Sequence, residues 1–147
     1  MDAWRLASSR YDPLSGDGAR LFGGRWNSPG RPMVYASESL ALAVVESLVH
    51  ITGAFPSDYR AFRIGVPDGA VERLDSGLLK PAWTEDLAYT RAIGDQWLDQ
   101  ARTVALVVPS AVVAESLNVL VKPHHPGATE LRVTEREAFR FDPRLGA

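Results

Sequence analysis

The segment that most constrains the fold is an apolar stretch at residues 37–52 with one carboxylate near its middle. On a helix that turns 100° per residue, its apolar side chains fill two faces and leave a narrow stripe. The first face holds Leu40, Val44, Leu48 and Ile51, the second Leu42, Val45 and Val49, and the stripe Ser39, Ala43, Glu46 and His50. A helix that is apolar around most of its circumference is largely buried, so Glu46 faces either solvent through a slot or a cavity.

The capping residues predict where this helix starts and stops. Ser37 is a good N-cap, Glu38 is an acidic residue of the kind favoured in the first turn, and Gly53 is expected to end the helix. A second helix is expected over residues 84–102, capped by Thr84, with a break at Gly94. Strands are expected at residues 3–7, 32–36, 59–66, 70–74, 104–108, 118–121 and 130–134. These elements follow no regular βαβ rhythm, which predicts an α+β fold with a mixed or antiparallel β core and flanking helices.

Length and composition place the chain among ordinary globular proteins. Its 147 residues fit one domain, here 1–147, and 46% of them are hydrophobic. The net charge of -2 gives no general attraction to nucleic acid or to anionic membranes. The chain has no cysteine, its start does not read as a signal peptide, and no apolar run reaches the ~18 residues of a membrane span. We therefore expect a cytoplasmic protein with no membrane partner.

A glycine-rich stretch at residues 8–30 forms the longest expected loop, and long loops in small domains tend to be functional. Within it, GGRWN places Arg25 just after two residues that allow close backbone approach, and an arginine fork suits a phosphate. Alternatively, Arg25 pairs with a surface acid. Tyr35 ends a predicted strand beside this loop, where its ring either stacks on a flat cationic ring or belongs to the core with a solvated hydroxyl.

Three further positions follow predicted strands. Ser110 comes directly after a buried strand and either serves a site or only caps the next turn. Asn118 opens the NVL segment, and a rigid loop, KPHHPGA, holds His124 and His125. Two adjacent histidines do not easily share one metal, and no third ligand has suitable spacing, so we expect no metal.

Taken together, four segments resemble the RES-domain family, which is named for an arginine, a glutamate and a serine. They are GGRWNSPGRPMVYAS, SLALAVVESLVH, IGDQWLDQARTVALVVPSAVVAESLNVLVKP and FRFDPRL, and the resemblance spans residues 4–145. It implies a fold like that of bacterial ADP-ribosyltransferase toxins and a toxin of a toxin–antitoxin pair. It also implies NAD+ as the substrate and an Xre-like antitoxin that covers the active site.

The resemblance assigns roles to individual residues. The implied catalytic set is Glu46, Arg25, Tyr35 and Ser110, and the implied dinucleotide-binding set is Arg5, Arg25, Tyr35, Ser110 and Asn118. Glu46 would stabilise the charge on the ribose, the two arginines would neutralise the pyrophosphate, and Tyr35 would pack on the nicotinamide. Ser110 would either bind the carboxamide or orient Glu46. Some members have a tyrosine after the first arginine; here the residue is Leu6, so any stacking role there is lost or moved.

Several functions stay open at this point. ADP-ribose transfer to a protein is the main prediction, and the acceptor could instead be water or phosphate, giving a glycohydrolase or a phosphorylase. A ribonuclease toxin is a second alternative, against which the acidic balance and the lack of a basic stripe count. A module that binds a nucleotide or a partner protein without catalysis is the third.

Overall fold

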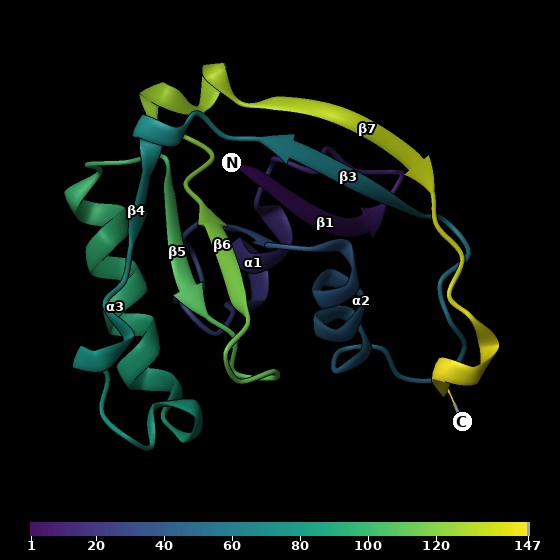
Figure 1. The fold of residues 1–147 in the computed structure, drawn as a ribbon, viewed down its shortest axis with the longest axis horizontal. Coiled ribbons are helices and arrows are strands. Elements are labelled where there is room, and N and C mark those ends of the chain that lie inside the picture. The colour runs from purple at the N-terminus through teal and green to yellow at the C-terminus, as the bar shows by residue number, and fades with distance from the viewer. Residues whose placement is uncertain (147) are drawn as a thin grey trace.

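The computed structural model describes residues 1–146, the side chain of residue 135 excepted, and shows one mixed sheet with helices packed on it (Figure 1). The strands are β1 (Asp2–Ser8), β2 (Val34–Ser37), β3 (Tyr59–Gly65), β4 (Val71–Arg73), β5 (Ala105–Pro109), β6 (Leu117–Val121) and β7 (Arg132–Ala138). The helices are α1 (Asp17–Phe22), α2 (Leu40–Leu48) and α3 (Leu87–Gln100). The strand order is β4-β5-β6-β2-β1-β3-β7, and only the β4–β5 pair is parallel among the pairs described. The predicted α+β class with flanking helices is confirmed.

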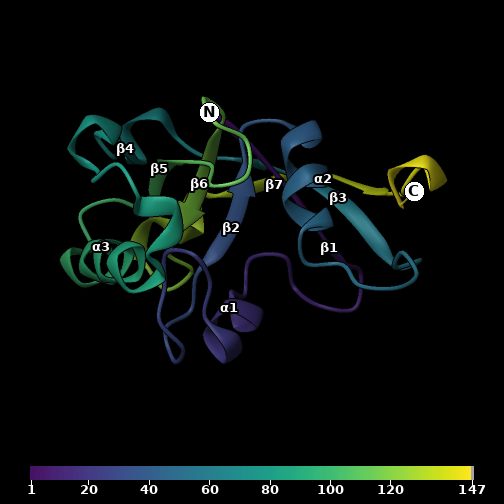
Figure 2. The same cartoon turned by 90° about the horizontal axis from the view of Figure 1, so that it is seen from below.

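The sheet curls, so that β4, β5 and β6 run across the direction of β1, β3 and β7 in Figure 1. Alternation along the strands gives it two different faces. Side chains on the inner face of the curl form one core cluster, which includes Val34, Ala36, Ile64, Val107 and Val119. The outer face is covered in two separate places, and Figure 2 shows α3 and α2 on opposite sides of β2.

Two core clusters cover the outer face. Near β5 and β6, Leu106, Val108 and Leu120 pack with Trp97 and Leu98 of α3. Near β1 and β3, Leu6 and Ala61 pack with Ala43 of α2 and with Phe141. The end of β2 lies between these two helix-covered regions, so polar side chains there meet neither helix's apolar core.

Helix α2 is shorter than predicted at both ends. Ser39, not Ser37, is its N-cap: the Ser39 hydroxyl accepts from Leu42 N at 3.1 Å, while Ser37 belongs to β2. The helix ends at Leu48, well before Gly53. A tight bond from His50 N to Ser47 O closes the last turn at 3.1 Å, and the Ser47 hydroxyl bonds Ala43 O in competition with the helix ladder.

Helix α3 also differs from the prediction. Asp86 caps it by accepting from Tyr89 N at 3.0 Å, whereas Thr84 lies in a preceding 3-10 turn, Trp83–Glu85. The helix runs through Gly94 without the expected break. A Cβ at Gly94 would lie 1.7 Å from Trp26 O, so this glycine serves the close packing of α3 on the loop that precedes β2.

Other boundaries shift by a few residues. The expected long loop at residues 8–30 contains α1, a short helix flanked by glycines. Strand β7 covers residues 132–138 instead of 130–134, and Glu130 belongs to a 3-10 turn, Pro126–Glu130. The expected rigid loop is fixed to the end of α3, because Lys122 Nζ bonds Leu98 O at 2.7 Å and His125 Nε2 bonds Ala101 O at 2.8 Å.

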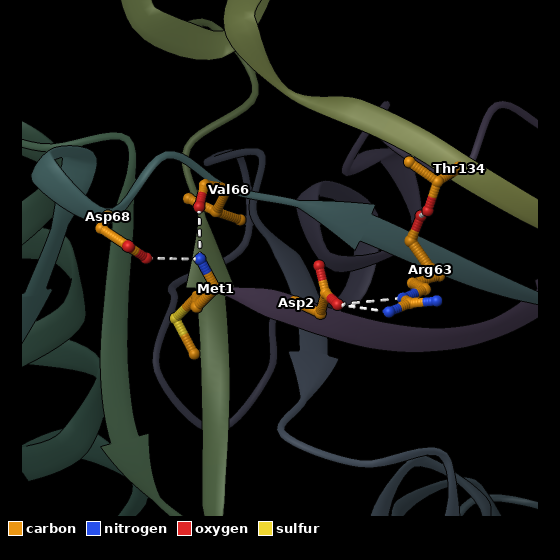
Figure 3. Close-up of polar contacts among 6 residues, drawn as sticks. All are labelled: Met1, Asp2, Arg63, Val66, Asp68 and Thr134. Carbon is orange, nitrogen blue, oxygen red and sulfur yellow. Dashed lines mark hydrogen bonds and ion pairs between the residues drawn. The ribbon is translucent and has the colours of Figure 1, made fainter.

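Met1 and Asp2, at the N-terminal end of β1, are held by polar contacts (Figure 3). The Met1 ammonium donates to Val66 O at 2.6 Å and to Asp68 at 2.7 Å, and Arg63 pairs with Asp2 at 2.7 Å. These contacts secure the start of β1, the strand that carries Arg5.

No helix within residues 1–146 combines the length and the apolar character that crossing a bilayer requires.

Candidate active site

The carboxylate of Glu46 projects from α2 onto the polar end of the outer face. Its Oε1 accepts two hydrogen bonds, from Ser110 Oγ at 2.7 Å and from Asn118 Nδ2 at 2.6 Å. Both bonds go to a charged acceptor, which makes them stronger than neutral ones. Within residues 1–146 no donor is found for Oε2. Of the two predictions for this residue, the structure therefore favours a carboxylate held at a site over a solvated stripe.

Ser110 is buried and its hydroxyl has a defined direction. Val112 N donates to Ser110 Oγ at 3.1 Å and Val113 N at 3.0 Å, so both acceptor positions are filled. The single hydroxyl proton is then committed to Glu46. Ser110 does both things that the sequence left open, because it caps the next turn and also orients the glutamate.

Asn118 reaches the same oxygen from the neighbouring strand. It is the second residue of β6 and stands opposite Ser37 of β2 in the strand register. Ser37 Oγ donates to Asn118 Oδ1 at 2.8 Å, and the Asn118 amide in turn donates a hydrogen bond to Glu46. This role of Ser37 is not predicted by the sequence, in which the residue has the features of a helix cap. The pairing of β2 with β6 places Ser37 beside Asn118, and no local sequence pattern reveals that pairing.

Tyr35 packs against the core, as the second of its two predictions had it, but its hydroxyl is bound by protein groups and not solvated. Its hydroxyl donates to Asn27 Oδ1 at 2.7 Å and accepts from Trp26 N at 2.9 Å. Burial raises the pKa of the Tyr35 phenol far above its ordinary value of about 10. A Cβ on Gly24 would lie 2.6 Å from the Tyr35 oxygen, so the second glycine of GGRWN permits this contact.

Asn27 is the centre of the glycine-rich loop and is fully buried. Its Nδ2 is within bonding distance of the carbonyls of Ala19 at 2.9 Å, Ser28 at 3.2 Å and Arg31 at 2.9 Å. Together with the Tyr35 bond, these contacts attach the loop to β2. The asparagine of GGRWN is thus a structural residue that the sequence analysis did not single out.

Arg5 is half-buried on β1 and carries a charge without a carboxylate partner in the described part of the chain. Its NH1 donates to Tyr35 O at 2.9 Å, and its buried Nε has no hydrogen-bond partner. Burial lowers the pKa of the Arg5 guanidinium, because desolvation disfavours the charged form. A desolvated guanidinium nitrogen without a partner is costly, so Arg5 is a candidate residue for binding an anion.

Arg25 lies on the same loop as Asn27, and its NH1 donates to Thr84 O at 2.9 Å. Among the carboxylates that the structure describes, none forms an ion pair with Arg25, so the alternative of a surface acid as partner is not what these residues show. Thr90 of α3 holds the Arg25 carbonyl at 2.6 Å. Among the described residues Arg25 has no hydrogen bond to Glu46, Ser110 or Asn118, and the loop that carries it is bound to Tyr35 of β2.

Strand β2 is the element that links the predicted residues. Tyr35 bonds the loop that carries Arg25, its carbonyl accepts from Arg5, and Ser37 two residues on connects to Glu46 through Asn118. Residues i and i+2 of a strand lie on one face about 7 Å apart.

In the described residues no group of three or more acidic or histidine side chains gathers as a metal site would require.

Comparison with known proteins gives a consistent picture. Residues 2–142 match the RES domain. A protein of Sphingobium sp. named "Prs ADP-ribosylating toxin" is 38% identical over 152 residues, covering 97% of this chain and 94% of that protein. "Toxin Res" of Pseudomonas putida is 38% identical over 148 residues, covering 99% of each chain.

A solved structure shows the same fold. In the crystal structure of the Mycobacterium tuberculosis MbcT–MbcA toxin–antitoxin complex, a chain matches with a TM-score of 0.69 and 25% identity, covering 95% of this chain and 84% of that one. MbcT itself is named an NAD(+) phosphorylase, and it is 46% identical over a stretch of 44 residues, 29% of this chain.

Proposed function

Because this chain belongs to the RES-domain family, we propose that it is a toxin that breaks the nicotinamide–ribose bond of NAD+ and transfers the ADP-ribose. The observation that carries the proposal is the state of the Glu46 carboxylate. Two donors hold one of its oxygens, and the other is unpaired among the described residues. Such a carboxylate is preorganised, and it has one oxygen left for a substrate.

One carboxylate is enough for this reaction. An ordinary glycosidase needs a second carboxyl group to protonate the departing oxygen. Nicotinamide leaves from a positively charged ring nitrogen: the C1′–N bond breaks, the electron pair goes to the ring, and no proton is required. The positive charge then moves to the ribose, where the free oxygen of Glu46 stabilises it. Electrostatic stabilisation of this kind is worth on the order of 10²–10³ in rate.

The half-buried Arg5 supports a dinucleotide as the substrate. Its Nε lacks a partner and its guanidinium lacks a carboxylate in the described part of the chain. A diphosphate supplies the missing anion, and a guanidinium fork matches phosphate oxygens. We assign Arg5 and Arg25 to the diphosphate. Tyr35 acts by fixing the loop that carries Arg25, and the face of its ring remains our candidate for packing on the nicotinamide.

The acceptor of the ADP-ribose is the second part of the proposal. We propose transfer to a protein, because the relative named as an ADP-ribosylating toxin is similar over 97% of this chain. Transfer to phosphate is the second candidate, since the structural neighbour MbcT is named a phosphorylase. Either reaction harms the cell that makes the enzyme. We therefore also propose an antitoxin partner, which the toxin–antitoxin complex of the structural neighbour supports. We propose that it is of the Xre-like type and covers the Glu46 site, as the family resemblance implies.

Nicotinamide release from NAD+ by the purified chain tests the cleavage. Glu46→Gln keeps the size of the side chain and one oxygen that can accept from Ser110 and Asn118, but it removes the charge and replaces the other oxygen with an NH2 donor. We expect nicotinamide release to fall by at least 10²-fold. Glu130→Gln, in the Pro126–Glu130 turn, is the matched control and should keep full activity. A Glu46→Gln variant as active as the wild type would overturn the assignment.

Labelled NAD+ added with cell lysate separates the acceptors. Label on a protein band supports ADP-ribosyl transfer. Label found only in small molecules contradicts it, and a product whose formation requires added phosphate identifies the phosphorylase reaction. RNA loss on expression without loss of NAD+ would favour the ribonuclease alternative instead.

A further inference from the structure

We propose that Ser37 is a positioning residue that acts on Glu46 through Asn118. This inference rests on the proposed function, since it concerns the carboxylate to which that function assigns the chemistry. It adds a residue that lies outside the arginine–glutamate–serine set. The relay runs from Ser37 Oγ to Asn118 Oδ1 at 2.8 Å, and from Asn118 Nδ2 to Glu46 Oε1 at 2.6 Å.

Glu46 decides which end of the Asn118 amide must face it. An ionised carboxylate only accepts hydrogen bonds, so Asn118 has to present its NH2 group. The opposite orientation would bring the amide oxygen against Glu46 Oε1, two acceptors at hydrogen-bond distance. The amide oxygen is thereby turned toward β2, where it needs a donor.

Ser37 supplies that donor. It is 3% exposed and stands directly opposite Asn118 in the register of β2 and β6, and its hydroxyl makes no other hydrogen bond among the described residues. Without the hydroxyl, Asn118 Oδ1 would lack a protein donor and the amide would be free to rotate about its terminal torsion. The N–H that binds Glu46 would rotate with it. Hydrogen bonds in such a chain also polarise one another, which strengthens the last bond.

The second donor on Glu46 shows why the relay matters. Ser110 is fixed by two backbone N–H groups of its own turn, so its direction needs no help. Asn118 has no such anchor: its side chain bonds only Glu46 and Ser37 among the described residues. One donor to the carboxylate is therefore held by the backbone and the other by Ser37 alone.

A double-mutant cycle on nicotinamide release tests the relay. We expect Ser37→Ala to lower kcat by about 3- to 10-fold and to leave KM for NAD+ within about 2-fold, because it removes one neutral hydrogen bond. Asn118→Ala should lower kcat on the order of 10²-fold, as expected for loss of a donor to a reacting carboxylate. The decisive result is the double variant, which should be no slower than Asn118→Ala alone.

Ser47→Ala is the matched control. It also removes a serine hydroxyl, next to Glu46 in the chain, but that hydroxyl bonds Ala43 O within α2 and does not touch the relay. We expect its kcat to stay within about 2-fold of the wild type. A purely structural role for Ser37 predicts that Ser37→Ala slows the Asn118→Ala variant by its full factor again, and that result would overturn the proposal.

The side-chain amide signals of Asn118 in a 1H–15N spectrum give a readout that needs no turnover. Asn118→Ala identifies the pair of signals by their loss. Ser37→Ala should shift them and Ser47→Ala should not; signals unmoved by Ser37→Ala would refute the relay. If the wild-type chain released no nicotinamide, the proposed function would fail, and this spectrum would still decide whether Ser37 positions Asn118.

Discussion

Removing the hydroxyl of Tyr35 tests whether this residue serves the site by fixing the glycine-rich loop. Tyr35→Phe keeps the ring and deletes one oxygen. That oxygen donates to Asn27 Oδ1 at 2.7 Å and accepts from Trp26 N at 2.9 Å. Asn27 is fully buried and Trp26 is 2% exposed, so water does not easily replace the lost partner.

The magnitude follows from the two groups left unpaired. Each buried donor or acceptor without a partner costs about 1–3 kcal/mol, and relaxation of the loop recovers part of this, so we expect Tyr35→Phe to lower the free energy of unfolding by roughly 2–4 kcal/mol. For a chain of this length that corresponds to a fall in Tm of about 6–15 °C. Urea unfolding followed by tryptophan fluorescence measures it directly, because Trp26 lies in the affected loop.

Activity separates the two roles considered for Tyr35. If the hydroxyl fixes the loop, Tyr35→Phe raises KM for NAD+, since Arg25 is carried by that loop. If only the ring matters, KM is unchanged. Tyr11→Phe is the control, because Tyr11 is 68% exposed and should change neither value. A Tyr35→Phe protein that unfolds within about 0.5 kcal/mol of the wild type would refute the reasoning.

Three further predictions concern stability. Burial raises the pKa of Tyr35 above its unfolded value of about 10, so above pH 10 the folded state keeps a proton that the unfolded state loses, and stability declines. The difference in unfolding free energy between the wild type and Tyr35→Phe should therefore narrow there by up to about 1.4 kcal/mol per pH unit. A difference that stays constant with pH would contradict this. Gly94→Ala should lower the free energy of unfolding by about 1–3 kcal/mol or more, measured by thermal unfolding, because the new Cβ would collide with Trp26 O. An unchanged stability would show that the close packing of α3 on the Trp26 backbone does not require glycine. Arg5→Met should melt at the same or a higher temperature than the wild type, because it removes a half-buried charge whose buried Nε has no partner. KM for NAD+ should rise by at least 10-fold, and a large drop in Tm would mean that the arginine is a structural residue.

Hydrophobic periodicity predicted most of the fold. The buried run at residues 104–108 and the alternation at 59–66 appear as β5 and β3 with small changes of boundary. Helix ends were harder, because Ser37 and Ser39 both suit a cap and only the pairing of Ser37 with Asn118 assigns the first to β2. Gly94 was misread as a helix break, since a sequence does not show which backbone lies against a glycine.

The candidate site could be predicted only in part. The resemblance named Glu46, Ser110 and Asn118, and the structure brings these three into direct contact. Local patterns could not do so, because the three residues come from α2, the end of β5 and β6. Ser37 was missed for the same reason. Tyr35 was named for its ring, and its hydroxyl turned out to bind the loop, a contact that depends on the close approach of Gly24.

The most direct test of the proposed function is a crystal structure of the Glu46→Gln protein with NAD+ bound. We predict that the nicotinamide ribose lies beside the side chain of residue 46, with the diphosphate on Arg5 or Arg25. A dinucleotide bound elsewhere would contradict the proposed function, for example in the open hollow beside α3 that Ser28, Arg91 and Asp95 line.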